Sequence, residues 1–267
     1  MKALTKAGLI ILGAGVVLAA IGWSLSGKYS NTGKTTSYTE TADDYEKDIK
    51  NIDIDSSFGN INIVKGDSIK FVADDVLSKY SMHLAHNGNT LSIDSDKKIK
   101  NKPFGENFDF GFNSTQSGNY TLYLPDRLYD EISVSTSFSD LSISNIKCRN
   151  ASFDISFSEA AISNLNVSSN LKLNSSFADT NVDMGGSKLE TLSLDSSFGD
   201  FKINNAEVTN SVDISSSFGD VNLKLKGDKY SVKKNYCSFG DTNFNSDFSG
   251  GTPISIDSSF GDISFDK

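Results

Sequence analysis

The stretch ISSSFGDVNL, residues 214–223, is one copy of a phrase that recurs along most of this 267-residue chain. Close copies are LDSSFGDFKI at 194–203 and IDSSFGDISF at 256–265. From Phe138 onward the central phenylalanines follow one another at steps of 19 to 21 residues, and the 80 residues between Phe58 and Phe138 equal about four periods. A fixed period near 20 predicts structural units stacked on one another. The central phenylalanines are Phe58, Phe138, Phe157, Phe177, Phe198, Phe218, Phe239 and Phe260.

The order of apolar residues within the phrase predicts a corner after each phenylalanine. Alternate residues of a strand share a face, so the apolar residues of 212–218 lie on one side, with Phe218 among them. The next apolar set, in 221–225, begins three residues beyond Phe218, which reverses the parity at Gly219 and Asp220. A straight strand cannot keep both sets inside. A corner can, because glycine permits a positive φ and aspartate bonds turn backbone.

We therefore predict an all-β fold, a single-stranded β-solenoid or β-helix-like stack of rungs of about 20 residues. Successive rungs would pair in register as parallel ladders about 4.8 Å apart. The eight phenylalanines would form an internal ladder of stacked rings. The inward serines Ser196, Ser216 and Ser258 would hydrogen-bond along the stack, because buried hydroxyls need partners.

Two parts of the chain depart from the repeat. Within residues 64–130 we expect antiparallel pairing or irregular rungs, with a tight hairpin turn at His86–Asn89 and a loop insertion at 97–119. Later, Lys233, Asn235 and Cys237 fall where inward residues are expected, which indicates a distorted rung.

The N-terminus predicts a membrane anchor. Residues 7–25 contain no charged side chain, and as a helix they would span about 28 Å, close to the thickness of a bilayer core. Lysines before this stretch place the N-terminus in the cytoplasm and the rest outside. The expected parts are a cytoplasmic segment at 1–6, a transmembrane helix at 7–26, a flexible linker at 27–48 and an extracellular β-strand-repeat domain at 49–267. A cleaved signal peptide or a buried soluble helix remain alternatives.

Charge and cysteine content exclude other classes of protein. The formal net charge is −9 with dispersed acidic residues, so nucleic-acid binding is not expected, because it needs clustered Lys and Arg. Cys148 and Cys237 fall about four rungs apart, roughly 19 Å at the spacing of stacked strands, which is too far for a disulfide.

No set of residues predicts catalysis, a cofactor or a metal site. There is no Gly-x-Ser-x-Gly sequence, and His83 and His86 point to opposite faces of a predicted strand. A row of corner acids could bind Ca²⁺, but its composition is not uniform, and the alternative is that each acid caps its own turn. The row is Asn60, Asp140, Glu159, Asp179, Asp200, Asp220, Asp241 and Asp262.

The 97–119 insertion contains the best candidate contact patch, because exposed aromatic residues on a loop often mark a binding surface. The alternative is that these residues cover one end of the solenoid. The patch consists of Phe104, Phe108, Phe110 and Phe112.

YTLYLPD at 120–126 followed by SFGD rungs, behind one N-terminal apolar segment, resembles the bacterial putative-adhesin β-strand-repeat family, which includes LiaG-like proteins. The resemblance covers residues 48–267. It implies a cell-envelope location, a β-solenoid-like fold, and roles in adhesion or the envelope-stress response. It transfers no catalytic residue.

These observations predict a non-enzymatic, single-pass membrane protein that displays a solenoid outside the cell as an adhesin or envelope-stress accessory module. The alternatives are a structural envelope component without a specific ligand and a glycan-active β-helix enzyme. The expected partner is a cell-envelope component or a protein of unknown identity. Either self-association or docking of a partner is also expected at the C-terminal strand, which would be an unpaired sheet edge.

Overall fold

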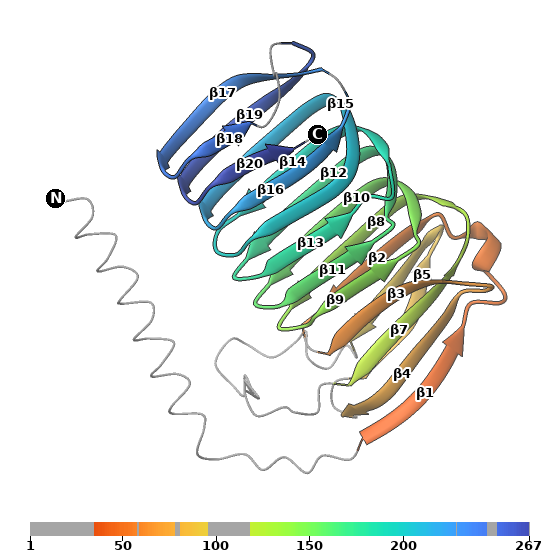
Figure 1. Cartoon of the computed structure of the whole chain (residues 1–267). Coiled ribbons are helices and arrows are strands. Elements are labelled where there is room, and N and C mark those ends of the chain that lie inside the picture. The colour runs from red at the N-terminus through yellow and green to blue at the C-terminus, as the bar shows by residue number, and fades with distance from the viewer. Residues whose placement is uncertain are drawn as a thin grey trace, which may run out of the picture.

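The computed structural model describes residues 35–57, 59–77, 81–95, 118–227, 229–244 and 250–266, and shows one continuous sheet wound into a stack of rungs (Figure 1). The predicted transmembrane helix and Phe58 lie outside these ranges. Within them, the structure contains no helix with the length and apolar composition of a membrane span.

Each rung consists of a first strand and a second strand that lie on two sides of the stack, called here the long and the short strands because the first is longer in every rung from β8 onward. The long strands are β2 (Asn51–Ser56), β6 (Thr90–Ser95), β8 (Leu128–Ser137), β10 (Lys147–Ser156), β12 (Asn166–Ser176), β14 (Lys188–Ser196), β17 (Tyr230–Phe239) and β19 (Thr252–Phe260). The strands after the corner are β3 (Asn60–Gly66), β7 (Asn119–Pro125), β9 (Leu141–Ser144), β11 (Glu159–Ser163), β13 (Asp179–Asp183), β16 (Val221–Lys226), β18 (Thr242–Phe244) and β20 (Ile263–Asp266). The strand β15 (Phe201–Phe218) runs from the short side of one rung into the long side of the next.

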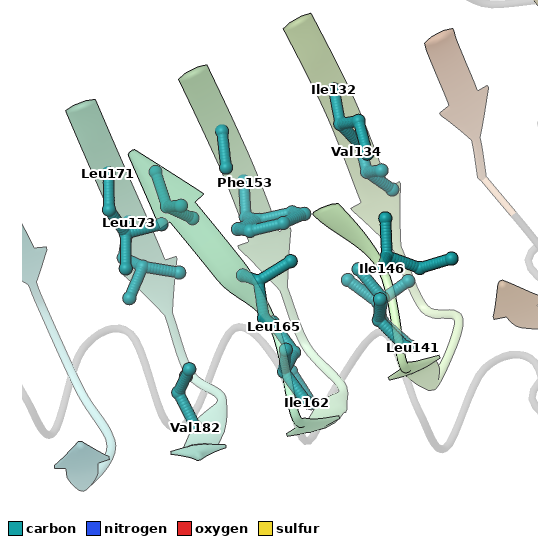
Figure 2. Close-up of a cluster of buried hydrophobic side chains, with 14 of the residues drawn as sticks. Ile132, Val134, Leu141, Ile146, Phe153, Ile162, Leu165, Leu171, Leu173 and Val182 are labelled. Carbon is teal, nitrogen blue, oxygen red and sulfur yellow. The ribbon is translucent and has the colours of Figure 1, made fainter. Parts of the chain in front are cut away.

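The rungs pair in parallel and in register, as predicted. One inward column runs through Val134, Phe153, Leu173, Leu194 and Ile214, each the direct partner of the next, and all five are buried. Across the interior, Leu141, Ile162 and Val182 from the short strands face Val134, Phe153 and Leu173 from the long strands (Figure 2). The core is therefore a set of apolar layers, one per rung, that no single rung could enclose.

The order of rungs differs from the order of the sequence at both ends of the stack. The rung β2–β3 lies between β6–β7 and β8–β9. The rung β19–β20 lies between β15–β16 and β17–β18. The spacing of about four periods between Phe58 and Phe138 was therefore misleading, because their rungs are direct neighbours. The C-terminal strand β20 is paired on both sides, so the predicted unpaired edge belongs to β17 and β18 instead.

An antiparallel cap closes the N-terminal end. The strand β1 (Thr35–Thr41) pairs with β4 (Lys70–Leu77), β4 pairs with β7, and β5 (Met82–Asn87) pairs with β6. The 3₁₀ helix η1 (Glu46–Asp48) follows β1. The predicted hairpin turn at 86–89 and the predicted antiparallel pairing are confirmed.

The predicted flexible linker at 27–48 is wrong for its second part, because residues 35–41 form β1. This stretch is rich in Thr, which favours strands, and Tyr38 packs against the core and stacks on His83 with ring centroids 5.2 Å apart. Tyr38, the paired backbone and hydrogen bonds made by Ser37 and Glu40 together order this otherwise polar strand.

The rung with misplaced polar residues is explained by its position at the end of the stack. The ladder between β17 and β19 shifts register between Val232 and Lys234, which places Asn235 opposite the buried Ile256. Asn235 is exposed because no described rung lies beyond it, and its amide donates to the Thr242 hydroxyl at 2.9 Å. A polar residue is suited to this position, since terminal repeats need a polar outer face.

Candidate functional site

The phenylalanines of the repeat form a stacked column, but the column is not internal. Neighbouring rings from Phe138 to Phe239 lie 4.5–5.0 Å apart between centroids, with planes within 10° of parallel. Phe157, Phe177 and Phe239 are 42%, 46% and 57% exposed. For the seven rings that the structure describes, the predicted stacking is therefore confirmed and the predicted interior location is wrong. In stack order the members are Phe138, Phe157, Phe177, Phe198, Phe218, Phe260 and Phe239.

The corner itself moves the rings out of the core. Phe138, Phe157 and Phe177 have φ angles of 54–57°, which end the strand alternation that would have pointed them inward. In the rungs of Phe198, Phe218 and Phe260 the following glycine has the positive φ instead, as at Gly219 (φ 144°). The left-handed conformation costs a bulky residue about 1–2 kcal/mol, so three consecutive rungs keep a strained phenylalanine where glycine or asparagine would fit more easily.

The corner acids form a second column beside the rings. The backbone N–H of Asp220 donates to Oδ1 of Asp200 at 2.8 Å, and the N–H of Asp262 donates to Oδ1 of Asp220 at 2.8 Å. The same contact joins the backbone of Glu159, Asp200 and Asp241 to the acids of neighbouring rungs. Five of the acids, Asp140, Asp179, Asp200, Asp220 and Asp262, therefore accept a hydrogen bond from a neighbouring rung rather than capping their own turns. Neighbouring charges about 4.8 Å apart repel by about 1 kcal/mol in water.

The inward serines also act differently from the prediction. The hydroxyls of Ser196 and Ser216 donate to the carbonyls of Gly199 and Gly219, three residues ahead in the same rung, at 3.1 and 3.2 Å. They close their own corners instead of linking rungs, while Ser258 has no hydrogen-bond partner for its buried hydroxyl.

A second corner of the rung was missed by sequence reasoning. Asn145, Asn164 and Asn205 have φ angles of 49–61°, which asparagine tolerates better than other residues. The Asn164 amide donates to the Asn145 side-chain oxygen at 2.7 Å, so this corner is also laddered. The available signal was the recurrence of asparagine in ISN at 143–145 and 162–164 and in INN at 203–205.

The outer face of the long strands carries a polar groove of about 570 Å³ across β10, β12, β14, β15 and β19. Its columns are in register, and one runs Asp154, Asn174, Asp195, Ser215 and Asp257. The Asn174 amide hydrogen-bonds to Asp154. The groove therefore presents hydroxyl, amide and carboxylate groups at a fixed repeat. Its outward side chains are Asp154, Lys172, Asn174, Ser193, Asp195, Asp213, Ser215, Ser255 and Asp257.

The remaining ionisable groups occupy structural positions. Asp126 bridges Lys65 and Lys147 at 2.7 Å each, and hydrogen bonds from these lysines lower the pKa of its carboxyl to about 2. Burial raises the pKa of the Cys148 thiol to about 12. Both cysteines are free, and Cys148 on β10 is separated from Cys237 on β17 by the rungs of β12, β14, β15 and β19.

Of the other candidates from the sequence, the histidines lie apart. His83 contacts a carboxylate oxygen of Glu40 at 2.6 Å, whereas His86 stacks on Tyr45. Across the described ranges, no group of three or more His, Cys, Asp or Glu side chains could hold a metal ion. The patch of Phe104, Phe108, Phe110 and Phe112 lies outside the described residues.

The fold and these columns define a class, the parallel β-solenoid repeat proteins, in which each rung repeats one corner chemistry. Residues 49–267 match the Toastrack DUF4097 family, and the chain belongs to this family. The resemblance to a β-strand-repeat family is thereby confirmed.

Several solved structures match the chain over most of its length. A putative adhesin from Bacteroides fragilis is 16% identical with a TM-score of 0.42, and the match covers 87% of this chain and 97% of that chain. A putative cell adhesion protein from Clostridium sporogenes is 12% identical with a TM-score of 0.40, covering 87% of this chain and 99% of that chain. No curated protein matches the chain.

Proposed function

We propose that this chain is a non-enzymatic, membrane-anchored protein whose solenoid is displayed outside the cell and binds polymers of the cell envelope. The charge-free stretch at 7–25 with lysines before it supports the anchor and the orientation. The same display would suit an adhesin or an accessory module for envelope stress.

The polar groove over the long strands carries the proposal of binding. Five neighbouring rungs present hydroxyl, amide and carboxylate groups in straight columns. Such groups donate and accept hydrogen bonds along a line, which suits a polyhydroxylated chain lying across the rungs. The groove is open along its length, as binding of a polymer requires.

The groove is poorly suited to glycoside hydrolysis. A general acid for glycoside cleavage is usually held in an apolar pocket that keeps it protonated. The groove carboxylates of Asp154, Asp195, Asp213 and Asp257 are exposed instead. This arrangement favours binding over catalysis.

Sedimentation with isolated cell walls tests the proposal. The paired change Ser193→Tyr and Ser215→Tyr would fill the groove and reduce the bound fraction at least fivefold. The control pair, Asn181→Tyr and Lys202→Tyr, places the same bulk on exposed positions of the short strands and would leave binding unchanged. Equal binding by all three proteins would refute the groove as the contact surface.

Protease treatment of intact cells tests the display. Cleavage of the solenoid in intact cells, with the N-terminal segment retained in the membrane fraction, is expected. A solenoid that is cut only after lysis would refute the orientation.

A structural envelope component without a ligand is the second candidate. It is favoured by side chains that bond to one another along the ladders, such as Asn170 with Asn150 at 2.8 Å. This candidate predicts that cell walls, teichoic acids and lipid vesicles are all left unbound.

A further inference from the structure

One edge of the solenoid combines a partly exposed apolar strip with a row of negative charge. The strip is the phenylalanine column, and the row consists of the exposed corner acids that follow each phenylalanine by two residues. Six intervals of 4.5–5.0 Å give the column a length of roughly 29 Å. In stack order the acids are Asp140, Glu159, Asp179, Asp200, Asp220, Asp262 and Asp241. We call the two columns together the Phe–acid edge.

The rings expose their edges and not their faces. The ring planes are within 10° of parallel and each inner ring has a neighbour on both faces. Stacking of a sugar or a base on a ring face is therefore blocked inside the column. What remains accessible is an apolar ridge, exposed at Phe157, Phe177 and Phe239 and half-buried at the other four rings. Such a ridge is suited to aliphatic and aromatic side chains of a protein.

The phenylalanine column does not belong to the hydrophobic core. The seven rings are absent from the buried apolar core, and three of them occupy the left-handed conformation that phenylalanine rarely adopts. Strain kept at an exposed position is a reason to look for a binding role.

The acid row is suited to a cationic partner. Five acids each use one carboxylate oxygen to accept the backbone N–H of the next rung. Among the ion pairs seen in the described ranges, none involves an acid of this row. The backbone contacts hold the acids at the rung spacing, so the row presents a line of exposed negative charge that attracts positive charge from a partner.

The repeat along the edge favours a helix over an extended peptide. One turn of an α-helix rises about 5.4 Å and about 20 residues span 30 Å, whereas alternate side chains of a strand lie about 6.7 Å apart. A rung repeat of about 4.8 Å is therefore matched more closely by helical turns, and the length fits the roughly 29 Å column.

We propose that the Phe–acid edge is a docking surface for a basic amphipathic helix of a partner protein. The apolar stripe of the helix would lie on the ring edges, and its Lys and Arg side chains would lie over the acid row. This surface lies at the corners of the rungs and is separate from the polar groove proposed to bind envelope polymers.

The charge requirement is testable without disturbing the fold. The triple change Asp179→Asn, Asp200→Asn and Asp220→Asn removes three charges, but the amide oxygen of each asparagine can still accept the backbone N–H. The probe is a synthetic 20-residue helical peptide with leucine on one stripe and lysine beside it, and a scrambled peptide of the same composition is the control. The triple variant of the full-length protein in detergent is expected to bind the helical peptide about tenfold more weakly by calorimetry.

A matched set of charges elsewhere controls for net charge. Asp154→Asn, Asp195→Asn and Asp213→Asn remove three charges from the polar groove and are expected to leave the affinity within twofold of the original. Raising the salt concentration should weaken binding to the original protein and much less to the edge variant.

The apolar requirement has its own pair of variants. Phe157→Asn and Phe177→Asn remove two ring edges while placing asparagine where a left-handed φ is tolerated. Weaker binding at an unchanged far-ultraviolet circular dichroism spectrum would support the docking surface, and an unchanged affinity would overturn it.

Other outcomes would also overturn the proposal. Equal binding of the helical and scrambled peptides would reduce the edge to a general attraction for cations. If the original protein forms dimers and the edge variants do not, the Phe–acid edge binds a second copy of this chain instead. Peptide binding that appears only after deletion of residues 96–117, which contain four lysines and four phenylalanines, would make a segment of the same chain the occupant.

Discussion

Substitution of Gly219 by alanine should be among the most damaging single changes in the chain. A Cβ at this position would lie 2.1 Å from the backbone oxygen of Gly199 in the neighbouring rung, far inside normal contact, and the φ of 144° is one that alanine rarely adopts. Strain at such an angle costs about 1–3 kcal/mol, and forcing extra volume against backbone costs about 1–3 kcal/mol more. The expected loss in the free energy of unfolding is therefore about 4 kcal/mol, a large part of the 5–15 kcal/mol that folded domains possess.

Three other glycines separate the two causes. Gly88 has a φ of 59° with open space around it, so alanine there tests the backbone angle alone and should cost about 1 kcal/mol. Gly240 has no such angle, but a Cβ would lie 2.1 Å from the oxygen of Gly261, so alanine there tests crowding alone and should cost about 1–3 kcal/mol. Gly250 has neither feature, and alanine there should be neutral or stabilise by less than about 1 kcal/mol.

The assays are urea denaturation and thermal denaturation of the full-length protein in detergent, both monitored by the circular dichroism of the strands. The expected loss of about 4 kcal/mol corresponds to a decrease of about 8–16 °C in the Tm of the Gly219 variant, because 1 kcal/mol shifts the Tm of a domain of this size by about 2–4 °C. Equal losses at Gly219 and Gly88, or a loss below 1 kcal/mol at Gly219, would refute the claim that rungs approach too closely here for any side chain.

Three further outcomes are expected from named groups. The lysine partners of Asp126 lower the pKa of its carboxyl to about 2. The contribution of this carboxylate to stability is therefore complete above the unfolded pKa of about 3.9 and is lost as the pH falls through about 2. A midpoint near 3.9 in an NMR titration of the Asp126 carboxyl would contradict this. A thiol reagent at pH 8 should modify the half-buried Cys237 in the native protein and Cys148 only after unfolding, since burial raises the pKa of Cys148 to about 12; two modified thiols in the native state would be inconsistent with it. Deletion of residues 250–267 should reduce the Tm and also release β17, measured by hydrogen exchange, because the last rung lies inside the stack; retained protection of β17 would refute the rung order.

The repeat could be predicted from the sequence because the same local interactions form each rung. The period near 20, the parity change after Phe218 and the apolar pairs around it depend on strand alternation and corner geometry, which are properties of neighbouring residues. The parallel register and the inward columns followed from these alone.

The position of the phenylalanine rings, outside the core, could not be predicted in the same way. Strand parity placed Phe157 and Phe177 inside, but parity ends where the strand ends, and the positive φ falls on the phenylalanine itself. The acids were correctly placed at corners, yet their acceptor role across rungs depends on the backbone of a neighbour that alternation does not describe. The polar groove likewise exists only once five rungs lie side by side.

The amino-acid sequence by itself determined the rung, its corner and the parallel stack, because those follow from short-range periodicity and turn chemistry. Only the tertiary structure decided which rungs are neighbours at the two ends. The strand β19 could have continued the stack beyond β17, and it lies instead between β15 and β17. The entropic cost of closing a loop changes slowly with its length. The packing of whole rungs therefore decides which of two equivalent sheet edges a strand joins, and this packing cannot be predicted from a local sequence pattern.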